Sequence, residues 1–145
     1  MNILVAVDLS AASDQVIEAA RGVADLTGAS MYVLHVVEAD PEVVVYDADP
    51  EVAQTRIARD YPLEHQRVCA LVEKLEDEGL DANSWLARGP GVASTLKEAA
   101  RLEAGLIVVG THGHGAVYDA LIGSYSAGII RKSKLPILVV PVRGS

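Results

Sequence analysis

The sequence predicts an α/β protein built on an open, parallel, five-stranded sheet with helices on both of its faces. The first observation is that the chain contains five short apolar runs, each as long as a buried strand. The second is that segments with helical spacing separate these runs, which favours parallel strands joined by right-handed crossovers. The third is that no repeat, low-complexity segment or linker interrupts the alternation, so residues 1–145 are expected to form one domain. The five runs are residues 2–7, 31–37, 81–87, 106–109 and 136–140.

The first strand has the sequence NILVAV and is followed directly by Asp8. Ser10 is predicted to cap the next helix, and Gly28 to end it. The second strand, MYVLHVV, then covers residues 31–37. The inner face of the helix between these strands is expected at Val16, Ala19, Ala20 and Val23, which follow the spacing i, i+3, i+4 and i+7.

Residues 38–62 are rich in acidic side chains and contain Pro41 and Pro50 on either side of the apolar sequence VVVY. We interpret this stretch as a mobile excursion from the sheet that becomes helical from Glu51. A regular helix follows over residues 62–79, and Gly79 is expected to end it. Its inner face is predicted at Val68, Leu71, Val72 and Leu75.

The third strand, residues 81–87, carries the only tryptophan of the chain, Trp85. A turn at residues 89–91 leads into a helix that precedes the fourth strand. The last helix is expected from Ser124 to about Ser133, before the final strand, PILVV. The helix after the turn should face the core with Val92, Leu96, Ala99 and Ala100.

A long glycine-rich loop follows the fourth strand, from Gly110 to the start of the last helix at Gly123 and Ser124. A loop of this length in a compact protein is more often functional than idle. Glycine lets the backbone approach a ligand and adopt positive φ, and a Ser at a helix N-cap lies beside free N–H groups that favour phosphate. The loop therefore predicts a phosphate site made of backbone rather than of basic side chains.

Two familiar phosphate motifs do not fit this loop. Aligned as a P-loop, the sequence has Ala116 where the lysine is required, and aligned as a dinucleotide fingerprint it has Tyr118 in place of the third glycine. The spacing that remains is Gly110-x-x-Gly113, nine residues, then Gly123 and Ser124. It resembles the nucleotide-binding motif of the universal stress protein family, in its ATP-binding branch, and the resemblance extends over essentially the whole chain.

The resemblance implies a Rossmann-like fold, similar to the adenine nucleotide alpha hydrolases, with strand order 3-2-1-4-5. In this arrangement the direction of the chain connections changes between the first and fourth strands. Asp8 and Gly110 would then face each other across the crevice that opens there. Asp8 would contact the ribose, although its alternative interpretation is a turn carboxylate. The backbone of Val36 would face the adenine. The nucleotide-binding residues expected from the resemblance are Ala6, Asp8, Val36, Gly110, His112, Gly113, Gly123, Ser124 and Tyr125.

His112 and His114 form an HxH pair, which also raises the possibility of a metal site. A zinc ion would need further ligands, and Cys69, His35 and His65 all lie on other predicted elements. We therefore expect no metal centre and place both histidines near the phosphates. His114 stands where relatives commonly carry Arg or Lys, and we interpret Arg88 as a surface residue.

Composition excludes several classes of function. A net charge of −8 argues against nucleic-acid binding. No apolar run approaches the roughly 18 residues of a membrane span. The strand that begins at Asn2 leaves no room for a signal peptide, and the single Cys69 fits a reducing compartment. We expect a cytoplasmic protein without nucleic-acid or membrane partners.

The resemblance implies a stress-response regulatory module that binds ATP, AMP or ADP, with Mg²⁺, and hydrolyses it slowly or not at all. Two alternatives stay open: a slow ATPase or phosphoryl-transfer enzyme using the same site, and a dimeric stress protein that binds no nucleotide. No catalytic constellation is visible in the sequence.

A homodimer is expected through the last strand, which would lie at a bare apolar edge of the sheet, unless residues 38–62 cover that edge. The interface residues would be Ile137, Leu138, Val139 and Val140.

Overall fold

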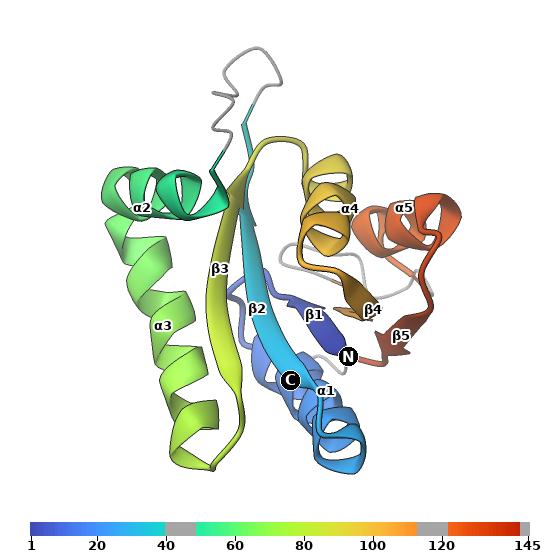
Figure 1. Cartoon of the computed structure of the whole chain (residues 1–145). Helices are drawn as coiled ribbons and strands as arrows, with labels where there is room; N and C mark the ends of the chain where they lie inside the picture. Colours follow the sequence, from blue (N-terminus) through green and yellow to red (C-terminus); the bar gives the residue numbers. More distant parts are fainter. Residues whose placement is uncertain (40–48, 113–121, 143–145) are drawn as a thin grey trace.

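A computed structural model describes residues 1–39, 49–112 and 122–142 of the chain. Strands and helices alternate along it as the sequence predicts (Figure 1). The strands are β1 (Asn2–Ala6), β2 (Ser30–Val37), β3 (Ala82–Arg88), β4 (Ala104–Gly110) and β5 (Ile137–Val140). The helices are α1 (Ser13–Thr27), α2 (Pro50–Asp60), α3 (Pro62–Asp77), α4 (Gly91–Arg101) and α5 (Ser124–Lys132).

All five strands are parallel and form one sheet in the order β3-β2-β1-β4-β5, which confirms the expected order. The central strand β1 pairs with β2 on one side and with β4 on the other. The strand order therefore reverses at β1. The carboxyl ends of β1, β2 and β4 consequently meet at one end of the sheet, where open α/β sheets bind ligands.

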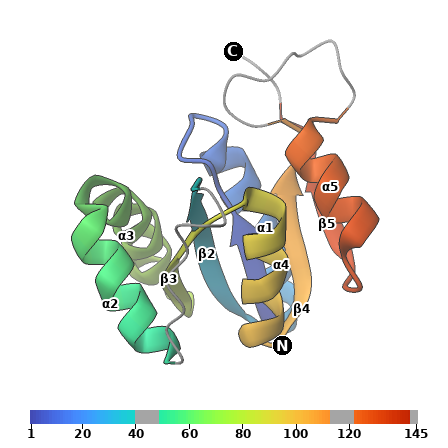
Figure 2. The same cartoon turned by 90° about the horizontal axis from the view of Figure 1, so that it is seen from above.

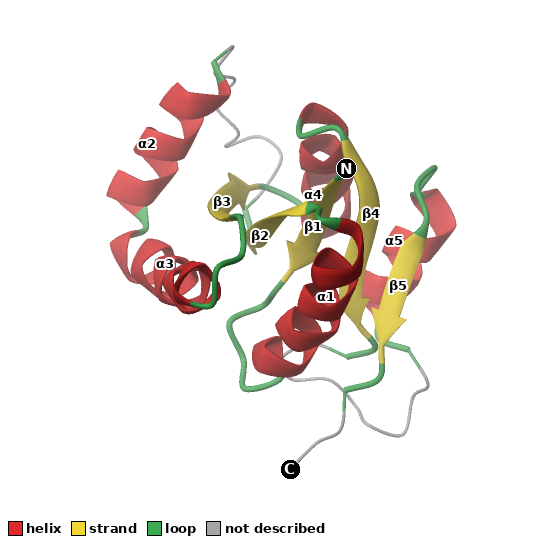
Figure 3. Ribbon diagram, turned by 60° about the horizontal axis from the view of Figure 1, so that its bottom comes forward, coloured by secondary structure: helices red, strands yellow, loops and turns green. Residues whose placement is uncertain are grey.

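Helices cover both faces of the sheet (Figures 2 and 3). One core cluster joins α1 and α3 to alternate residues of the strands, such as Ile3 and Val33. The other joins α4 and α5 to residues of the opposite parity, such as Leu4 and Leu34. This alternation follows from the twofold period of side chains along a strand.

The first helix starts later than expected. Its first residue is Ser13 and its N-cap is Ala12, whose side chain makes no capping hydrogen bond, so Ser10 is not the cap. Ser10 instead lies in the turn after β1. Of the predicted inner face, Val16 and Ala20 are buried, while Ala19 and Val23 are only partly buried at its margin.

The fourth helix turns a more polar side to the core than its apolar pattern predicts. Ala99 is buried as expected, but Ala100 is exposed. Ser94, Thr95 and Glu98 are buried instead. A pattern of apolar residues cannot reveal this face, because the side chains buried on it are polar.

The helix expected from Glu51 is present as α2. Asp49 caps it, accepting a hydrogen bond from the Glu51 N–H at 2.9 Å. It lies beside β3, at the opposite edge of the sheet from β5 (Figure 2). In the described part of the chain, the excursion therefore does not cover β5.

Candidate functional site

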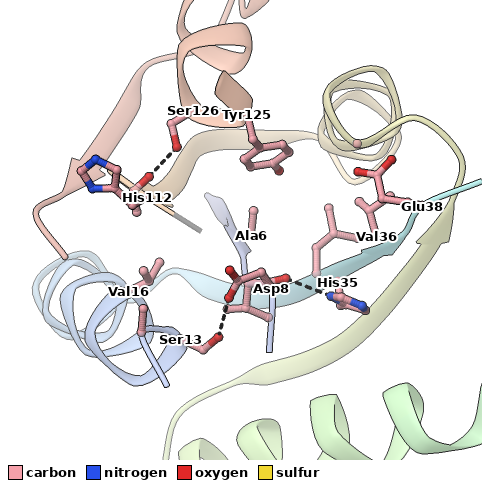
Figure 4. A pocket seen from close by; sticks show the side chains of 15 residues that line it. Ala6, Asp8, Ser13, Val16, His35, Val36, Glu38, His112, Tyr125 and Ser126 are labelled. Carbon is pink, nitrogen blue, oxygen red and sulfur yellow. Dashed lines mark hydrogen bonds between the residues drawn. The ribbon is translucent and has the colours of Figure 1, made fainter. Parts of the chain in front are cut away.

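A pocket with a cavity of about 340 Å³ opens at the carboxyl ends of β1, β2 and β4 (Figure 4). Its size lies at the lower end of the range of about 300–1,000 Å³ that is usual for small-molecule sites. It occupies the point where the strand order reverses, as the rule for open sheets predicts. The described lining residues are Ala6, Val7, Asp8, Ala12, Ser13, Val16, Leu34, His35, Val36, Glu38, Gly91, Gly110, His112, Tyr125 and Ser126.

Three helices begin at this pocket. Ser13 is the first residue of α1, Gly91 is the first residue of α4, and Tyr125 lies in the first turn of α5. The first N–H groups of a helix have no partner within the helix, and the helix dipole makes this end favourable for negative charge. The pocket therefore offers several backbone donors to an anionic ligand.

Asp8 is held in the turn between β1 and α1. Its Oδ1 accepts hydrogen bonds from the Ser10 N–H at 3.0 Å and from the Ser10 hydroxyl at 2.6 Å. The Ser13 hydroxyl lies 3.5 Å from the same oxygen (Figure 4). Asp8 is thus a turn carboxylate, which was the alternative interpretation, and it also lines the pocket.

The backbone of Val36 faces the space beyond the end of β1. The last bond of the β1–β2 ladder runs from the Val7 N–H to the Leu34 carbonyl, 2.8 Å. Backbone groups point to alternate sides along a strand, so the N–H and C=O of Val36 point the same way as those of Leu34. Because β1 has ended there, these two groups point towards the pocket.

The side chain of His35 fixes the end of β1. Its Nδ1 lies 3.1 Å from the Val7 carbonyl (Figure 4). A carbonyl can only accept a hydrogen bond, so Nδ1 carries the proton and donates it. If β1 continued, this carbonyl would instead accept the Val36 N–H, as in a regular parallel ladder. The contact with His35 therefore helps to leave the Val36 N–H facing the pocket.

The sequence analysis missed Glu38, which forms part of the pocket wall. A Cβ atom added to Gly91 would lie 2.6 Å from Glu38 Oε1 and 3.4 Å from Tyr125 Cδ1. Glu38, Gly91 and Tyr125 therefore converge, and a side chain at position 91 would have to displace the Glu38 carboxylate. Its spacing from Val36 could have identified Glu38. It follows Val36 by two residues, and residues two apart along an extended chain point to the same side.

Tyr125 is held by a hydrogen bond across α4 and α5. Its hydroxyl lies 2.7 Å from Thr95 Oγ1, and the Thr95 hydroxyl donates to the Gly91 carbonyl at 2.8 Å. Because the single Thr95 proton is used there, the Tyr125 hydroxyl donates to Thr95. Burial raises the pKa of Tyr125 to about 12, and Glu38 and Asp8 add to this rise.

The structure brings most of the predicted nucleotide-binding residues to this one pocket, but not all of them. Gly113 lies outside the described residues. Gly123 and Ser124 are not among the lining residues, and Gly123 rather than Ser124 is the N-cap of α5. Ser124 is instead the first residue of the helix. The predicted residues that line the pocket are Ala6, Asp8, Val36, Gly110, His112 and Tyr125.

Gly110 has a packing role that the sequence analysis did not assign. Neither Gly110 nor Gly123 adopts positive φ, so backbone freedom does not explain these two glycines. A Cβ at position 110 would lie 2.8 Å from Val142 Cγ2 and 3.1 Å from Val16 Cγ2. Glycine at 110 therefore leaves room for these two valines beside the end of β4.

The candidate metal ligands are dispersed in the described part of the chain. His65 and Cys69 lie on α3, with Nε2 and Sγ 3.3 Å apart, whereas His35 and His112 line the pocket. No group of three or more potential ligands forms among the described residues, and His114 lies outside them. Arg88 is half-buried, with its guanidinium 5.7 Å from the centre of the Tyr61 ring, and does not line the pocket.

The family model described as the universal stress protein family matches residues 1–141. A universal stress protein of Mycolicibacterium smegmatis is 35% identical over 143 residues, which are 95% of this chain but 47% of that protein. The chain thus spans about half the length of this relative. Universal stress protein A homolog 1 of Coxiella burnetii is 31% identical over 144 residues, covering 96% of this chain and 94% of that protein.

Solved structures share the fold. The structure of the protein MJ0577 has a TM-score of 0.78 at 23% identity, covering 99% of this chain and 97% of that one. A universal stress protein in complex with cAMP has a TM-score of 0.67 at 20% identity, covering 99% and 98%. The universal stress protein of Archaeoglobus fulgidus in complex with dAMP has a TM-score of 0.67 at 21% identity, covering 97% of each chain.

Proposed function

This chain belongs to the universal stress protein family, and we propose that it binds an adenine nucleotide in the pocket at the carboxyl ends of β1, β2 and β4. The observation that carries the proposal is the free peptide edge of Val36 beside Asp8 and the helix N-termini. A peptide N–H and C=O can pair with the acceptor and donor on the edge of adenine. Two structures of similar fold contain adenine nucleotides, cAMP and dAMP.

In this proposal each part of the nucleotide has its own partners. The adenine lies against Val36, and Asp8 accepts hydrogen bonds from the ribose hydroxyls. The phosphates lie towards Gly110 and the N-terminus of α5, where backbone N–H groups and the helix dipole favour an anion. In the described wall on that side, the Ser126 hydroxyl donates to the Gly110 carbonyl and so joins α5 to the end of β4.

We propose that binding, rather than turnover, carries the regulatory function in a stress response. Phosphoryl transfer needs positive charge on the transferred group, and the described residues that line the pocket include no Lys or Arg. ATP, ADP and AMP are all candidate ligands. Any Mg²⁺ would arrive on the nucleotide phosphates, since Mg²⁺ commonly binds one or two carboxylates together with substrate phosphates.

The remaining partner and location proposals have separate support. The outward-facing backbone edge of β5 supports a homodimer. The free thiol of Cys69 supports a reducing compartment such as the cytoplasm. No helix in the described residues has the length and apolar character needed to cross a membrane.

Replacing Val36 by Pro tests the site with little disturbance of the fold. The Val36 N–H points to the pocket, whereas the ladder with β3 uses the odd-numbered residues, as in the Gly89 N–H bond to the Val37 carbonyl at 2.9 Å. Val36→Pro therefore removes a pocket donor but no ladder bond. Calorimetric titration with AMP and ATP should show affinity reduced by at least about tenfold, the value of one hydrogen bond of roughly 1.4 kcal/mol.

Val36→Ala is the matched control, because it shortens the side chain and keeps the N–H. Thermal unfolding of both variants checks that they are folded. Equal nucleotide affinities for the Pro and Ala variants would place the base elsewhere. Mass analysis of natively purified protein provides an independent check, since a co-purified adenine nucleotide is expected.

A further inference from the structure

The pairing between β2 and β3 continues for two residues beyond the end of β2, and this places Glu38 in line with Val36. The Gly89 N–H donates to the Val37 carbonyl at 2.9 Å, and the Ala39 N–H donates to the Gly89 carbonyl at 3.3 Å. These bonds extend the parallel ladder of the two strands. Val36 and Glu38 alternate with the bonded residues, so their backbone groups point away from β3 and their side chains lie on one face of the sheet.

The Glu38 carboxylate lies on the wall of the pocket that Val36 and the start of α4 form. Its Oε1 is 2.6 Å from the position of a Cβ on Gly91, the first residue of α4, and Cδ1 of Tyr125 is 3.4 Å from the same position. Figure 4 shows Glu38 near Val36, with His112 on the opposite side of the pocket. Glu38 therefore lies on the side where the base is placed, and away from the side where the phosphates are placed.

The peptide edge of Val36 does not by itself distinguish adenine from a 6-oxopurine. It offers one donor and one acceptor. Adenine presents the N6 amino donor beside the N1 acceptor, and hypoxanthine presents the N1–H donor beside the O6 acceptor, so a base that turns over can still pair with this edge. The adenine amino group, however, carries a second hydrogen that hypoxanthine lacks. Selecting adenine by that hydrogen requires a further acceptor.

The direction of β2 shows where this second hydrogen lies. Along a strand the carbonyl of a residue comes after its N–H, so the Val36 carbonyl is nearer to Glu38 than the Val36 N–H is. In the proposed function the adenine amino group donates one hydrogen to that carbonyl. Because the two amino hydrogens point in different directions, the second is then directed onward along β2, towards Glu38.

We propose that Glu38 is a specificity-determining residue, whose carboxylate accepts the second amino hydrogen of adenine and selects 6-aminopurine over 6-oxopurine nucleotides. The inference rests on the proposed function and specifies its ligand class. An ionised carboxylate is an acceptor only, so it pairs with an amino group and repels the O6 of hypoxanthine or guanine. A site built to accept a hydrogen bond discriminates against an analogue that lacks the donor, because its own polar group is left without a partner.

Titration calorimetry on the full chain tests the proposal by comparing AMP with IMP, whose base is hypoxanthine. The two ligands carry the same ribose and phosphate, so the ratio of their affinities depends on the base alone. Wild type should bind AMP at least about tenfold more tightly than IMP, the discrimination that one hydrogen bond to a charged group supplies.

Glu38→Gln keeps the shape of the side chain and changes its hydrogen-bonding groups. The Gln amide can accept from an amino group or donate to O6. Glu38→Gln should therefore lower the ratio of AMP to IMP affinity by several-fold and raise the affinity for IMP itself, a gain that damage to the fold cannot produce. Weaker repulsion of the phosphate would instead raise both affinities equally and leave the ratio unchanged. The control is Glu73→Gln on α3, an exposed carboxylate outside the pocket, which should keep the wild-type ratio.

The outcomes separate the inference from the function on which it rests. If AMP binds to wild type and Glu38→Gln leaves the affinity ratio unchanged, nucleotide binding stands and Glu38 does not select the base. Wild type that binds IMP as tightly as AMP would also overturn the selection. If AMP, ATP and IMP all fail to bind to folded wild-type protein, the proposed function fails and the inference falls with it.

Discussion

Tyr125 connects the wall of the pocket to the start of α4 through a single hydroxyl. The hydroxyl donates to Thr95, which is fully buried, and Thr95 in turn donates to the Gly91 carbonyl. Gly91 also leaves the space that the Glu38 carboxylate occupies. Side chains from α4, α5 and the residue that follows β2 therefore fix the shape of the pocket on this side.

The raised pKa of Tyr125 predicts a specific loss of stability at alkaline pH. The folded protein holds the phenol proton up to a pKa of about 12, compared with about 10 in the unfolded chain. This contribution is fully present below pH of about 10 and is lost as the pH rises through about 12. Over that interval the free energy of unfolding of wild type should fall by up to about 3 kcal/mol more than that of Tyr125→Phe.

Urea unfolding followed by circular dichroism across this pH range measures the difference. At neutral pH, Tyr125→Phe should be less stable than wild type by about 1 kcal/mol, because the bond to Thr95 is absent. Tyr32→Phe on β2 is the control, since it removes a phenol hydroxyl that does not line the pocket. Parallel losses for wild type and Tyr125→Phe would show that Tyr125 does not titrate in this interval.

At the scale of single residues, the sequence predicted best where position along a strand determines the role. Asp8 and Val36 follow or end strands, so topology alone brings them to the same end of the sheet. Thr95 was missed because its role depends on a contact between separate helices, which leaves no local pattern in the sequence. Glu38 was missed although its spacing of two residues from Val36 was visible, because its contact with the start of α4 was not.

At the scale of elements, α2 protects one edge of the sheet. Gln54 pairs with both backbone groups of Leu86 on β3: its Nε2 donates to the Leu86 carbonyl at 2.6 Å, and its Oε1 accepts the Leu86 N–H at 2.7 Å. β3 is an edge strand, and an unpaired edge can pair with another chain. The side-chain amide of Gln54 thus takes the place of a neighbouring strand at Leu86.

Removing the Gln54 amide should destabilise the protein and expose this edge. Gln54→Ala loses two hydrogen bonds to a buried residue, which predicts a decrease of about 1–3 kcal/mol in the free energy of unfolding. Gln54→Glu should cost at least as much, because a carboxylate cannot donate to the Leu86 carbonyl and repels it. Chemical unfolding measures both, and light scattering detects any new self-association.

Gln66→Ala, at an exposed position on α3, is the control for loss of a glutamine. The role assigned to Gln54 is wrong if its Ala variant is as stable as the Gln66 variant. The sequence predicted the helix but not this role, since α2 has no fully buried residue and only Ile57 and Ala58 pack partly against the core. The buried face of α4 was also predicted wrongly, because it includes a charged side chain. Glu98 is buried, and burial raises the pKa of its carboxyl, an effect that Arg101 opposes.

At the scale of the whole molecule, the two edges of the sheet differ. Gln54 covers part of the outer edge of β3. β5 is the strand at the other edge of the sheet, and its neighbour within the sheet is β4. The Ile107 N–H donates to the Pro136 carbonyl and the Thr111 N–H to the Val140 carbonyl, so even-numbered residues of β5 face β4. Ile137 and Val139 therefore direct their N–H and C=O groups outwards.

This outward edge supports the proposed homodimer, in which a second copy adds its own β5 antiparallel across a twofold axis. The edge is apolar and carries no charge between Lys134 and Arg143, although natural edge strands are usually protected by charge. In the described chain, α2 lies beside β3 and so does not cover β5. The sheet order alone could not predict this asymmetry, because the protection of β3 depends on the side chain of Gln54.

Replacing Val139 by Pro tests the dimer at the backbone. The substitution removes an outward N–H and leaves the bonds between β5 and β4 in place, because those use the even-numbered residues. Val139 also packs partly against the core beneath α4 and α5, so Val139→Ala is the control that shortens the side chain but keeps the N–H. Sedimentation at micromolar concentrations should find wild type and the Ala variant dimeric, and the Pro variant a folded monomer. If the Pro variant stays dimeric, the two copies associate through another surface; if wild type is already monomeric, β5 remains an open edge in solution.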